Sequence, residues 1–475
     1  MNWETVIGLE VHVQLATRSK LFCGCATTYG AEPNTQVCPV CLGLPGALPV
    51  PNEAAIRLGS RAALALECTV HPTSVFARKN YFYPDLPKGY QISQFDRPLA
   101  TGGQVRCASP ERGLVSIGVT RLHLEEDAGK SVHDRIPGRT AIDLNRAGVP
   151  LAEIVSEPDL RSPAEARAYL TTLKQILIYA GVSDCDMEKG SLRVDANISL
   201  RPAGDSRLGT KTELKNLNSF ANVERALELE RARQALILDG GGAIEQVTLL
   251  FNAGTGQVRP MRSKEESHDY RYFPDPDLPP LVLDQAWIES ERAALPELPE
   301  AKRLRLTRDY GLPEYDARVL AAERAVADYF EAVVGAGAPA KAAANWVMGE
   351  VLAWYGERGA FPAPPPTIAD LIAMVTDGTV SLQAARKVLS EIGGTAEAPR
   401  AAAVRLGLVQ VRDDAALETW VDEVLASAGA EIARYRAGDL KLLGFFVGQV
   451  MKKSRGKADP KAIGEILTRK LGPTA

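Results

Sequence analysis

The most regular pattern in the chain is an alternation of polar and apolar residues along residues 6–15, which read VIGLEVHVQL. Glu10, His12 and Gln14 fall on one face of the predicted strand, and Leu and Val residues fall on the other. Four later segments repeat the pattern. They are Arg121-His123-Glu125, Asp143-Asn145, Arg193-Asp195-Asn197 and Lys211-Glu213-Lys215. The sequence therefore predicts a large, mostly antiparallel sheet with one packed face and one polar face.

Helical segments interrupt the predicted strands of residues 1–294. Ser162, with a proline next to it and an acid three positions on, is typical of a helix start, and this helix is expected to reach about Tyr179. A second helix is expected over residues 218–238, where a run of three glycines ends it. Strands and helices mixed in this way predict an α+β domain.

Residues 295–300, LPELPE, mark a boundary beyond which the sequence is rich in Ala and Leu. Helices are expected near residues 298–309, 315–335, 339–358, 367–394 and 397–405, with a stiff proline-rich connector at 361–367. We therefore predict three domains. They are an α+β catalytic domain at 1–294, an all-α helical domain at 295–405 and an all-α tail at 406–475.

Composition and charge narrow the classes of function. No apolar run is long enough to span a bilayer and no secretion signal stands at the start, so a cytoplasmic protein without a membrane is expected. The net charge of −4 means that any contact with nucleic acid is local. Residues 452–470 hold seven basic residues against two acids, which fits contact with an RNA backbone, although a solvated helix end is the alternative. The candidates are Lys452, Lys453, Arg455 and Lys457.

Four of the seven cysteines cluster in the sequence. Cys23 and Cys25 form one close pair, and Cys38 and Cys41 form a second pair after a short loop. Two such pairs predict a structural Zn²⁺ site in which four thiolates complete a tetrahedron, and reduced, packed thiols are the alternative. The other three cysteines are scattered and are expected to be structural.

The polar sheet face is the leading candidate for chemistry. Carboxylates bind Mg²⁺ and basic side chains bind phosphate, so their mixture on one face suits a triphosphate, whereas a single such strand would fit a solvated sheet. Residues 78–90 combine charges with four aromatic rings, as around a polar channel or an RNA end, and a tyrosine-rich loop that packs on its own domain is the alternative. Three consecutive acids in residues 123–130 suggest a metal-facing strand end, and residues 262–277 suggest a phosphate clamp.

These segments resemble one known family. They are residues 6–15, the four clustered cysteines, and residues 78–94, 123–130, 143–157, 193–199, 211–220 and 271–278. In this order they are similar to the B subunits of the aspartyl/glutamyl-tRNA amidotransferases, the GatB family, over essentially the whole chain. The C-terminal helices resemble the tRNA-binding tail of that family. Residues 270–300 lack the insertion of the archaeal relative, which favours the bacterial-type member of a three-subunit enzyme.

The resemblance implies a two-stage reaction. ATP phosphorylates the side-chain carboxylate of Glu-tRNA(Gln) or Asp-tRNA(Asn), and ammonia then displaces phosphate to give Gln-tRNA(Gln) or Asn-tRNA(Asn). An unactivated carboxylate is a poor electrophile, so this activation is chemically required. The implied partners are the amidase (A) subunit, which supplies ammonia, the small (C) subunit, the misacylated tRNA and a non-discriminating aminoacyl-tRNA synthetase. The implied cofactors are ATP, Mg²⁺ and structural Zn²⁺.

The resemblance also assigns roles to individual residues. The Mg²⁺ ligands and catalytic residues are Glu10, His12, Glu125 and Glu153. The ATP and phosphate residues are Arg193, Asp195, Lys211, Glu213, Lys215 and Arg262. The ammonia channel is lined by Lys79, Tyr81, Tyr83 and Lys88, with Glu125 at its gate. Because imidazole is an unusual ligand for Mg²⁺, a place for His12 just outside the ligand shell stays open.

Two other interpretations remain at this point. The first is a ligase that joins ammonia to a small acid without tRNA, and the basic tail argues against it. The second is a tRNA-docking scaffold without catalytic activity, and the many acids on the sheet face argue against that. The sequence leaves open whether Glu-tRNA, Asp-tRNA or both are substrates.

Overall fold

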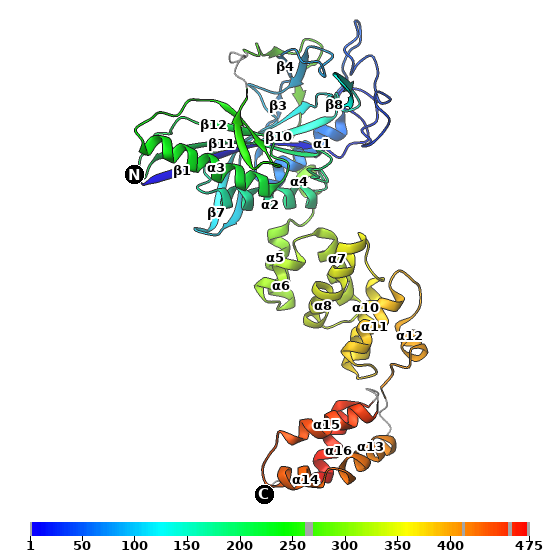
Figure 1. The fold of residues 1–475 in the computed structure, drawn as a ribbon. Helices are drawn as coiled ribbons and strands as arrows, with labels where there is room; N and C mark the ends of the chain where they lie inside the picture. Colours follow the sequence, from blue (N-terminus) through cyan, green and yellow to red (C-terminus); the bar gives the residue numbers. More distant parts are fainter. Residues whose placement is uncertain (1, 262–268, 411–413, 455–457, 473–475) are drawn as a thin grey trace. The chain divides into compact units, whose positions relative to one another are not determined.

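The computed structural model describes residues 2–261, 269–410, 414–454 and 458–472 of the chain (Figure 1). The chain divides into two compact units, residues 1–299 and 300–475. Arg262 of the predicted phosphate clamp and Arg455 and Lys457 of the basic cluster lie outside the described residues. The first unit contains every described strand, and the second is helical.

A nine-stranded sheet forms the centre of the first unit, in the order β14-β13-β12-β11-β1-β10-β7-β6-β2. Its strands are β1 (Trp3–Gln14), β2 (Thr69–Val70), β6 (Ala100–Ser109), β7 (Gly113–Glu126), β10 (Pro150–Ser156), β11 (Leu192–Pro202), β12 (Thr212–Lys215), β13 (Thr248–Asn252) and β14 (Gln257–Pro260). Among these neighbours only β12 and β13 pair in parallel, so the predicted mostly antiparallel sheet is confirmed.

The first strand of the chain, β1, lies in the middle of this sheet between β10 and β11. Leu9, Val11 and Val13 are buried, while Glu10 and His12 between them are only partly buried. The predicted division into a packed and a polar face is therefore confirmed. Helices cover the packed face, where the buried side chains of the first unit form one continuous hydrophobic core.

Four helices belong to the described part of the first unit. They are α1 (Glu53–Ala65), α2 (Pro163–Tyr179), α3 (Phe220–Asp239) and α4 (Gln285–Ala293). The Ser162 hydroxyl accepts a hydrogen bond from the Glu165 N–H at 3.2 Å, and α2 ends at Tyr179 as predicted. Ser219 caps α3 in the same way. Helices α2 and α3 pack on each other and on strands β6 and β11 (Figure 1).

Three smaller sheets complete the first unit. They are β15-β4-β5 (Phe273–Pro274, Ala77–Asn80, Tyr90–Ser93), β16-β3 (Leu281–Val282, Thr73–Ser74) and the hairpin β8-β9 (Lys130–Ile136, Arg139–Asp143). Strand β5 contacts β7 of the large sheet. The sheet β15-β4-β5 thus lies beside the polar residues of the large sheet.

The second unit consists of short helices. They are α5 (Pro299–Tyr310), α6 (Glu314–Leu320), α7 (Arg324–Gly335), α8 (Ala340–Trp346), the π-helix η1 (Val347–Val351), α9 (Leu352–Arg358), α10 (Pro365–Thr376), α11 (Leu382–Ile392), α12 (Pro399–Arg405), α13 (Asp414–Ala426), α14 (Gly429–Arg436), α15 (Leu442–Lys453) and α16 (Pro460–Leu471). The fold class predicted from the sequence, α+β followed by all-α, is confirmed.

Local differences from the prediction have physical reasons. The helix expected over residues 315–335 is interrupted by a turn after Leu320. The proline-rich connector is shorter than expected, because Pro365 and Pro366 form the first turn of α10. A proline at a helix start loses no hydrogen bond, since the first N–H groups have no helical partner.

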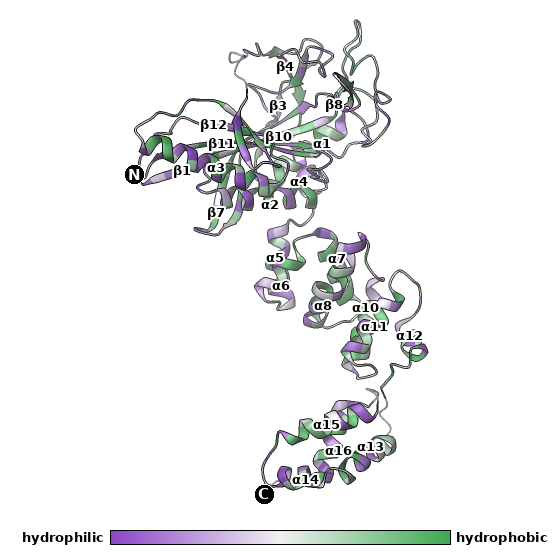
Figure 2. Ribbon diagram, in the orientation of Figure 1, coloured by the Kyte–Doolittle hydropathy of each residue, from purple (hydrophilic) through white to green (hydrophobic). Residues whose placement is uncertain are grey.

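Two separate hydrophobic clusters stabilise the helical unit. One runs from Leu306 to Ala403, and the other from Leu417 to Leu471. Leu406, Leu408 and Val409 pack on the first cluster. Hydrophobic and hydrophilic positions are mixed along these helices (Figure 2). Among the described residues, no helix combines the length and the apolar character needed to cross a membrane.

An ion-paired acid ties α7 to α5. Glu331 accepts hydrogen bonds from Lys302 Nζ at 2.7 Å and from Arg305 Nη1 at 2.6 Å. Burial raises the pKa of Glu331, but its hydrogen bonds to Arg305 and Lys302 outweigh burial and lower the pKa to about 2. Because the unfolded carboxyl has a pKa of about 4.3, this stabilisation is complete above that value and disappears as the pH falls through the folded pKa.

Replacing Glu331 with Gln should therefore lower the Tm of the helical unit at pH 7 by about 2–4 °C for each kcal/mol lost. At pH 3 the decrease in Tm should be smaller, because part of the stability that the Glu331 ion pairs give the wild-type protein is already lost at this pH. Circular dichroism melts at both values measure this difference. Glu357→Gln, at an exposed position, is the control. An equal loss at both pH values would contradict the ion-pair explanation.

Candidate active site and metal sites

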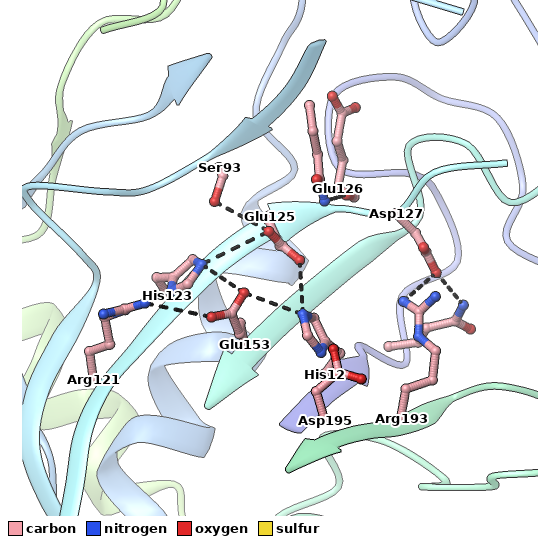
Figure 3. Close-up of polar contacts among 12 residues, drawn as sticks. His12, Ser93, Arg121, His123, Glu125, Glu126, Asp127, Glu153, Arg193 and Asp195 are labelled. Atoms are coloured by element: carbon pink, nitrogen blue, oxygen red, sulfur yellow. Dashed lines mark hydrogen bonds and ion pairs between the residues drawn. The ribbon is translucent and has the colours of Figure 1, made fainter. Parts of the chain in front are cut away.

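Polar side chains form a row across the centre of the large sheet. Arg193 of β11 lies opposite His12 of β1. His12 lies opposite Glu153 of β10, and Glu153 lies opposite His123 of β7. Glu125, two positions further along β7, points to the same row (Figure 3). The pairing register thus brings four distant segments of the chain together on one face.

Three of these side chains offer closely spaced ligand atoms to a metal ion. His12 Nε2 lies 3.3 Å from Glu153 Oε2 and 3.7 Å from Glu125 Oε1. The three ligand atoms all lie within 4.8 Å of one another. Glu10, the fourth predicted ligand, is not part of this trio and accepts a hydrogen bond from Asn197 Nδ2 at 3.4 Å.

The electrostatics of the row are those of crowded acids balanced by nearby bases. Burial raises the pKa of Glu153, but the charges of His123 and His12 outweigh burial and hold it well below its usual range. Glu10 differs, because burial and the neighbouring charge of Glu153 both raise its pKa. A cation beside Glu10 would relieve this repulsion, as expected at a metal or substrate site.

A cavity of about 250 Å³ opens over the row. Its lining consists of Glu10, His12, Lys79, Gln94, Phe95, Arg121, His123, Glu153, Asp195, Glu213, Lys215, Tyr270 and Tyr272. Lys215 Nζ lies 2.6 Å from an Asp195 oxygen and 3.0 Å from a Glu213 oxygen. Acidic and basic side chains from the large sheet and from the neighbouring small sheet thus line the same cavity.

Lys79 and three aromatic rings form one side of this cavity. Burial lowers the pKa of Lys79, but the charge of Glu125 outweighs it, and the pKa lies above its usual value. Lys79 Nζ lies 5.0 Å from the centre of the Tyr270 ring. The rings of Phe95 and Tyr272 stack at 4.2 Å. Sequence reasoning singled out the segment of Tyr270 and Tyr272 for its charges and missed these rings.

The three consecutive acids at the end of β7 do not share one site. Glu125 joins the metal-binding trio, whereas Glu126 points away, pairs with Lys88 and accepts a hydrogen bond from the Ile92 N–H at 2.9 Å. Asp127, fully enclosed, pairs with Arg193 Nη2 at 3.0 Å (Figure 3). Alternation along the strand explains why Glu126 leaves the row, because neighbouring side chains point to opposite faces, whereas Asp127 follows the end of β7 and meets Arg193 further along.

Some predicted site residues lie elsewhere in the first unit. Arg193 is turned toward Asp127, and Lys211 lines a second cavity of about 270 Å³ beside Glu10. Tyr81 donates a hydrogen bond to Gln91 at 3.1 Å, and Tyr83 is 57% exposed. Lys88 lines a third cavity, next to Cys23 and Cys41. The structure therefore brings Lys79 to the metal-binding trio but not Lys88.

The four clustered cysteines meet in space. The sulfur atoms of Cys23, Cys25, Cys38 and Cys41 lie within 4.8 Å of one another, which is compatible with a structural zinc site. The Cys38 N–H donates a hydrogen bond to Cys41 Sγ at 3.2 Å. A hydrogen bond from Cys23 is the main cause that lowers the pKa of Cys41 to about 4, despite burial. A deprotonated sulfur is what zinc binds.

Comparison with known proteins identifies the class to which this fold and site belong. Residues 5–289 match the family model described as the GatB/GatE catalytic domain. Residues 328–471 match the model described as the GatB domain. The first match contains His12, Glu125 and Glu153 and the four clustered cysteines.

Full-length relatives narrow the class to one protein family. A protein of Geotalea uraniireducens (strain Rf4) is 54% identical over 478 residues, covering 99% of this chain and all of the relative. Proteins of Geobacter sulfurreducens and Moorella thermoacetica are 52% and 53% identical with the same coverage of both chains. All three are named as the B subunit of aspartyl/glutamyl-tRNA(Asn/Gln) amidotransferase. The chain belongs to this family of amidotransferase subunits, as its sequence motifs indicated.

Proposed function

We propose that this chain activates the side-chain carboxylate of Glu-tRNA(Gln) or Asp-tRNA(Asn) with ATP and joins it to ammonia. The products are Gln-tRNA(Gln) and Asn-tRNA(Asn). The observation that carries the proposal is the row of His12, Glu125 and Glu153 under a cavity that also holds Lys79 and Lys215. Phosphoryl transfer to a carboxylate needs anionic groups to hold a metal and cationic groups to face the phosphate.

The metal-binding trio combines oxygen and nitrogen donors. Glu125 and Glu153 supply the oxygen ligands that Mg²⁺ takes, and bound Mg²⁺ would neutralise charge on the transferring phosphoryl group. His12 is a nitrogen donor, which Mg²⁺ rarely accepts. We assign His12 to orienting Glu153, to which its Nε2 lies 3.3 Å away. Glu10 adds a further carboxylate to the same cavity.

The charged residues beside the trio are assigned to substrate. Lys215, with Asp195 and Glu213, lines the cavity and would hold the phosphate groups of ATP. Lys211, in the neighbouring cavity, would also contact ATP. Arg193 lies opposite His12 on the next strand. Its guanidinium pairs with Asp127, so we assign it to holding the end of the row in place and not to binding ATP.

The acyl phosphate formed in this way reacts readily with water, so ammonia has to arrive by a protected route. The amidase partner, the A subunit of the enzyme, produces it, and the small C subunit completes the assembly. We assign the last part of the route to Lys79 and Tyr81, since Lys79 lies in the cavity and Tyr81 lies against Tyr270 with ring centres 5.9 Å apart. Lys88, which lines the cavity next to Cys23 and Cys41, and the exposed Tyr83 are assigned to an earlier part of the route.

The four clustered cysteines are assigned to structural Zn²⁺. Their sulfur atoms are close enough together to bind one ion, and the lowered pKa of Cys41 favours the thiolate that the metal requires. The metal would hold the loop of residues 23–41 in place beside the catalytic sheet and would take no part in the reaction.

Binding of the misacylated tRNA is assigned to the helical unit. Lys452 near the end of α15 is exposed, and Lys453 beside it pairs with Glu423. A few exposed cations of this kind contact a phosphate backbone without reading bases. A non-discriminating aminoacyl-tRNA synthetase supplies the charged tRNA.

A single assay tests the proposed function. The chain, assembled with its amidase and small partner subunits, is given ATP and Mg²⁺ together with Glu-tRNA(Gln), Asp-tRNA(Asn), uncharged tRNA or free glutamate. ADP should form with a misacylated tRNA and stay at background with uncharged tRNA and free glutamate. ADP formed equally with free glutamate would indicate a small-acid ligase, and no ADP under any condition would indicate a docking scaffold. The ratio of the ADP formation rates with Glu-tRNA(Gln) and with Asp-tRNA(Asn) shows which of the two tRNAs is the preferred substrate.

A further inference from the structure

One lysine of the first unit is buried without a carboxylate partner. Lys20 has no exposed surface. Its Nζ donates hydrogen bonds to the carbonyl oxygens of Gln36 at 2.7 Å and Leu144 at 3.4 Å, and lies 3.5 Å from Cys41 Sγ. Within the described part of the chain, no carboxylate oxygen forms an ion pair with it at 4.0 Å or less. A buried ammonium group without a counter-charge is strongly unfavourable.

The acid that lines the same cavity as Lys20 is already engaged. Glu126 lines the same cavity as Lys20, but its carboxylate is paired with Lys88 and accepts a hydrogen bond from the Ile92 N–H. Two carbonyl oxygens satisfy donors without supplying charge. The cysteine cluster, represented by Cys41, is therefore the group left to balance the lysine.

The charge of that cluster depends on what it holds. Zn²⁺ with four thiolates carries a net charge of −2, which a buried cation stabilises. We infer that Lys20 is the charge-balancing residue of a four-thiolate zinc site, a step that rests on the zinc assigned under the proposed function. It positions and stabilises Cys41 as a thiolate through an N–H···S hydrogen bond.

The same lysine connects the cysteine cluster to the β8-β9 hairpin. Leu144, whose carbonyl oxygen accepts from Lys20, follows strand β9 directly. The Leu144 N–H in turn donates to the Asn34 side chain at 2.8 Å, within the loop between the two cysteine pairs. Loss of the positive charge should therefore weaken zinc binding directly and, as a consequence, reduce the order of this loop.

Neutral variants test the inference. Lys20→Met removes the charge and the hydrogen bonds, whereas Lys20→Gln removes the charge but keeps a hydrogen-bond donor. Lys302→Met is the control, because it replaces another buried lysine, in the second unit. Zinc affinity of the assembled complex is measured by competition with a chromophoric chelator. Both Lys20 variants should lose affinity by roughly 10–100-fold, as for other residues that support metal ligands, while Lys302→Met retains it.

A thermal cycle separates a charge effect from a simple loss of packing. The Tm of wild type and of Lys20→Gln is measured with zinc and after chelation. Zinc should raise the Tm less in the variant, because the zinc site with four thiolates carries a net charge of −2 that Lys20 faces in the wild type, and nothing replaces the lysine in the variant. Equal zinc affinity and an equal Tm rise in wild type and both Lys20 variants would overturn the role of Lys20. Absence of zinc from the wild-type protein would instead overturn the proposed zinc site.

If both Lys20 variants fail to fold, cobalt replaces zinc in the wild-type protein. The intensity of the sulfur-to-cobalt absorption band scales with the number of bound thiolates. A band of four thiolates supports the doubly negative site that Lys20 balances. A band of three or fewer thiolates contradicts the four-thiolate site that the inference requires.

Discussion

Replacing Glu153 with Gln is expected to lower Gln-tRNA or Asn-tRNA formation by roughly 100-fold or more, since several kcal/mol of charge stabilisation depend on a metal-binding carboxylate. The amide keeps the shape of the side chain but removes the charge that His12, His123 and Arg121 face. The partner's hydrolysis of glutamine should stay within about twofold, because it takes place on another polypeptide. Product formation and glutamine hydrolysis are measured on the same assembled enzyme.

A nearby acid provides the control for this prediction. Glu157 lies just beyond β10, is exposed, and accepts a hydrogen bond from Thr120 at 2.8 Å. Glu157→Gln should leave both activities close to wild type. Normal amide formation by the Glu153 variant at saturating ammonium and Mg²⁺ would show that Glu153 takes no part in catalysis.

Removing the residues after Gln410 is expected to raise the apparent KM for misacylated tRNA roughly tenfold, because the last helices no longer bind phosphate groups of the tRNA. The cut keeps Leu406, Leu408 and Val409, which pack on the preceding helices. The salt dependence of tRNA binding should become flatter by about one unit of slope for each phosphate group that is no longer bound. ATP binding should not change, and fluorescence titrations with tRNA and ATP at several salt concentrations measure both effects.

Charge pairing in the tail limits which residues can produce this effect. Lys453 pairs with Glu423, and Lys470 pairs with Asp422 at 2.6 Å, both acids lying on α13. Lys452 has no such ion pair within the described part of the tail. Lys452→Ala should therefore weaken binding more than Lys470→Ala. Unchanged tRNA affinity after truncation would mean that the basic cluster is only a solvated helix face.

The sequence was most informative where local rules act. Alternation along residues 6–15 predicted the two faces of β1, and Ser162 with its neighbouring proline predicted the start of α2. The cysteine spacing predicted that four sulfur atoms would meet. Each of these features is set by residues within a few tens of positions of one another, so a linear pattern is enough to indicate it.

Features that depend on distant pairing could not be predicted in this way. The three acids after His123 look alike in sequence, yet Asp127 meets Arg193 and Glu126 meets Lys88, because strand register and pleat send them to different faces. Lys20 gave no signal, since a lysine is expected at the surface. Counting charges along residues 452–470 also did not reveal that acids on α13 pair with some of them.

The central position of β1 has a consequence during protein synthesis. This strand is made first, but its neighbours, β10 and β11, end at Ser156 and Pro202. At about 5–20 residues per second, the growing chain waits roughly 10–40 s before β11 is complete. Until β10 is complete, both backbone edges of β1 have no partner in the sheet, and one edge still has none until β11 is complete, a state in which strands readily aggregate. The arrangement that unites the polar row thus leaves the newborn chain open to aggregation until the later strands have emerged.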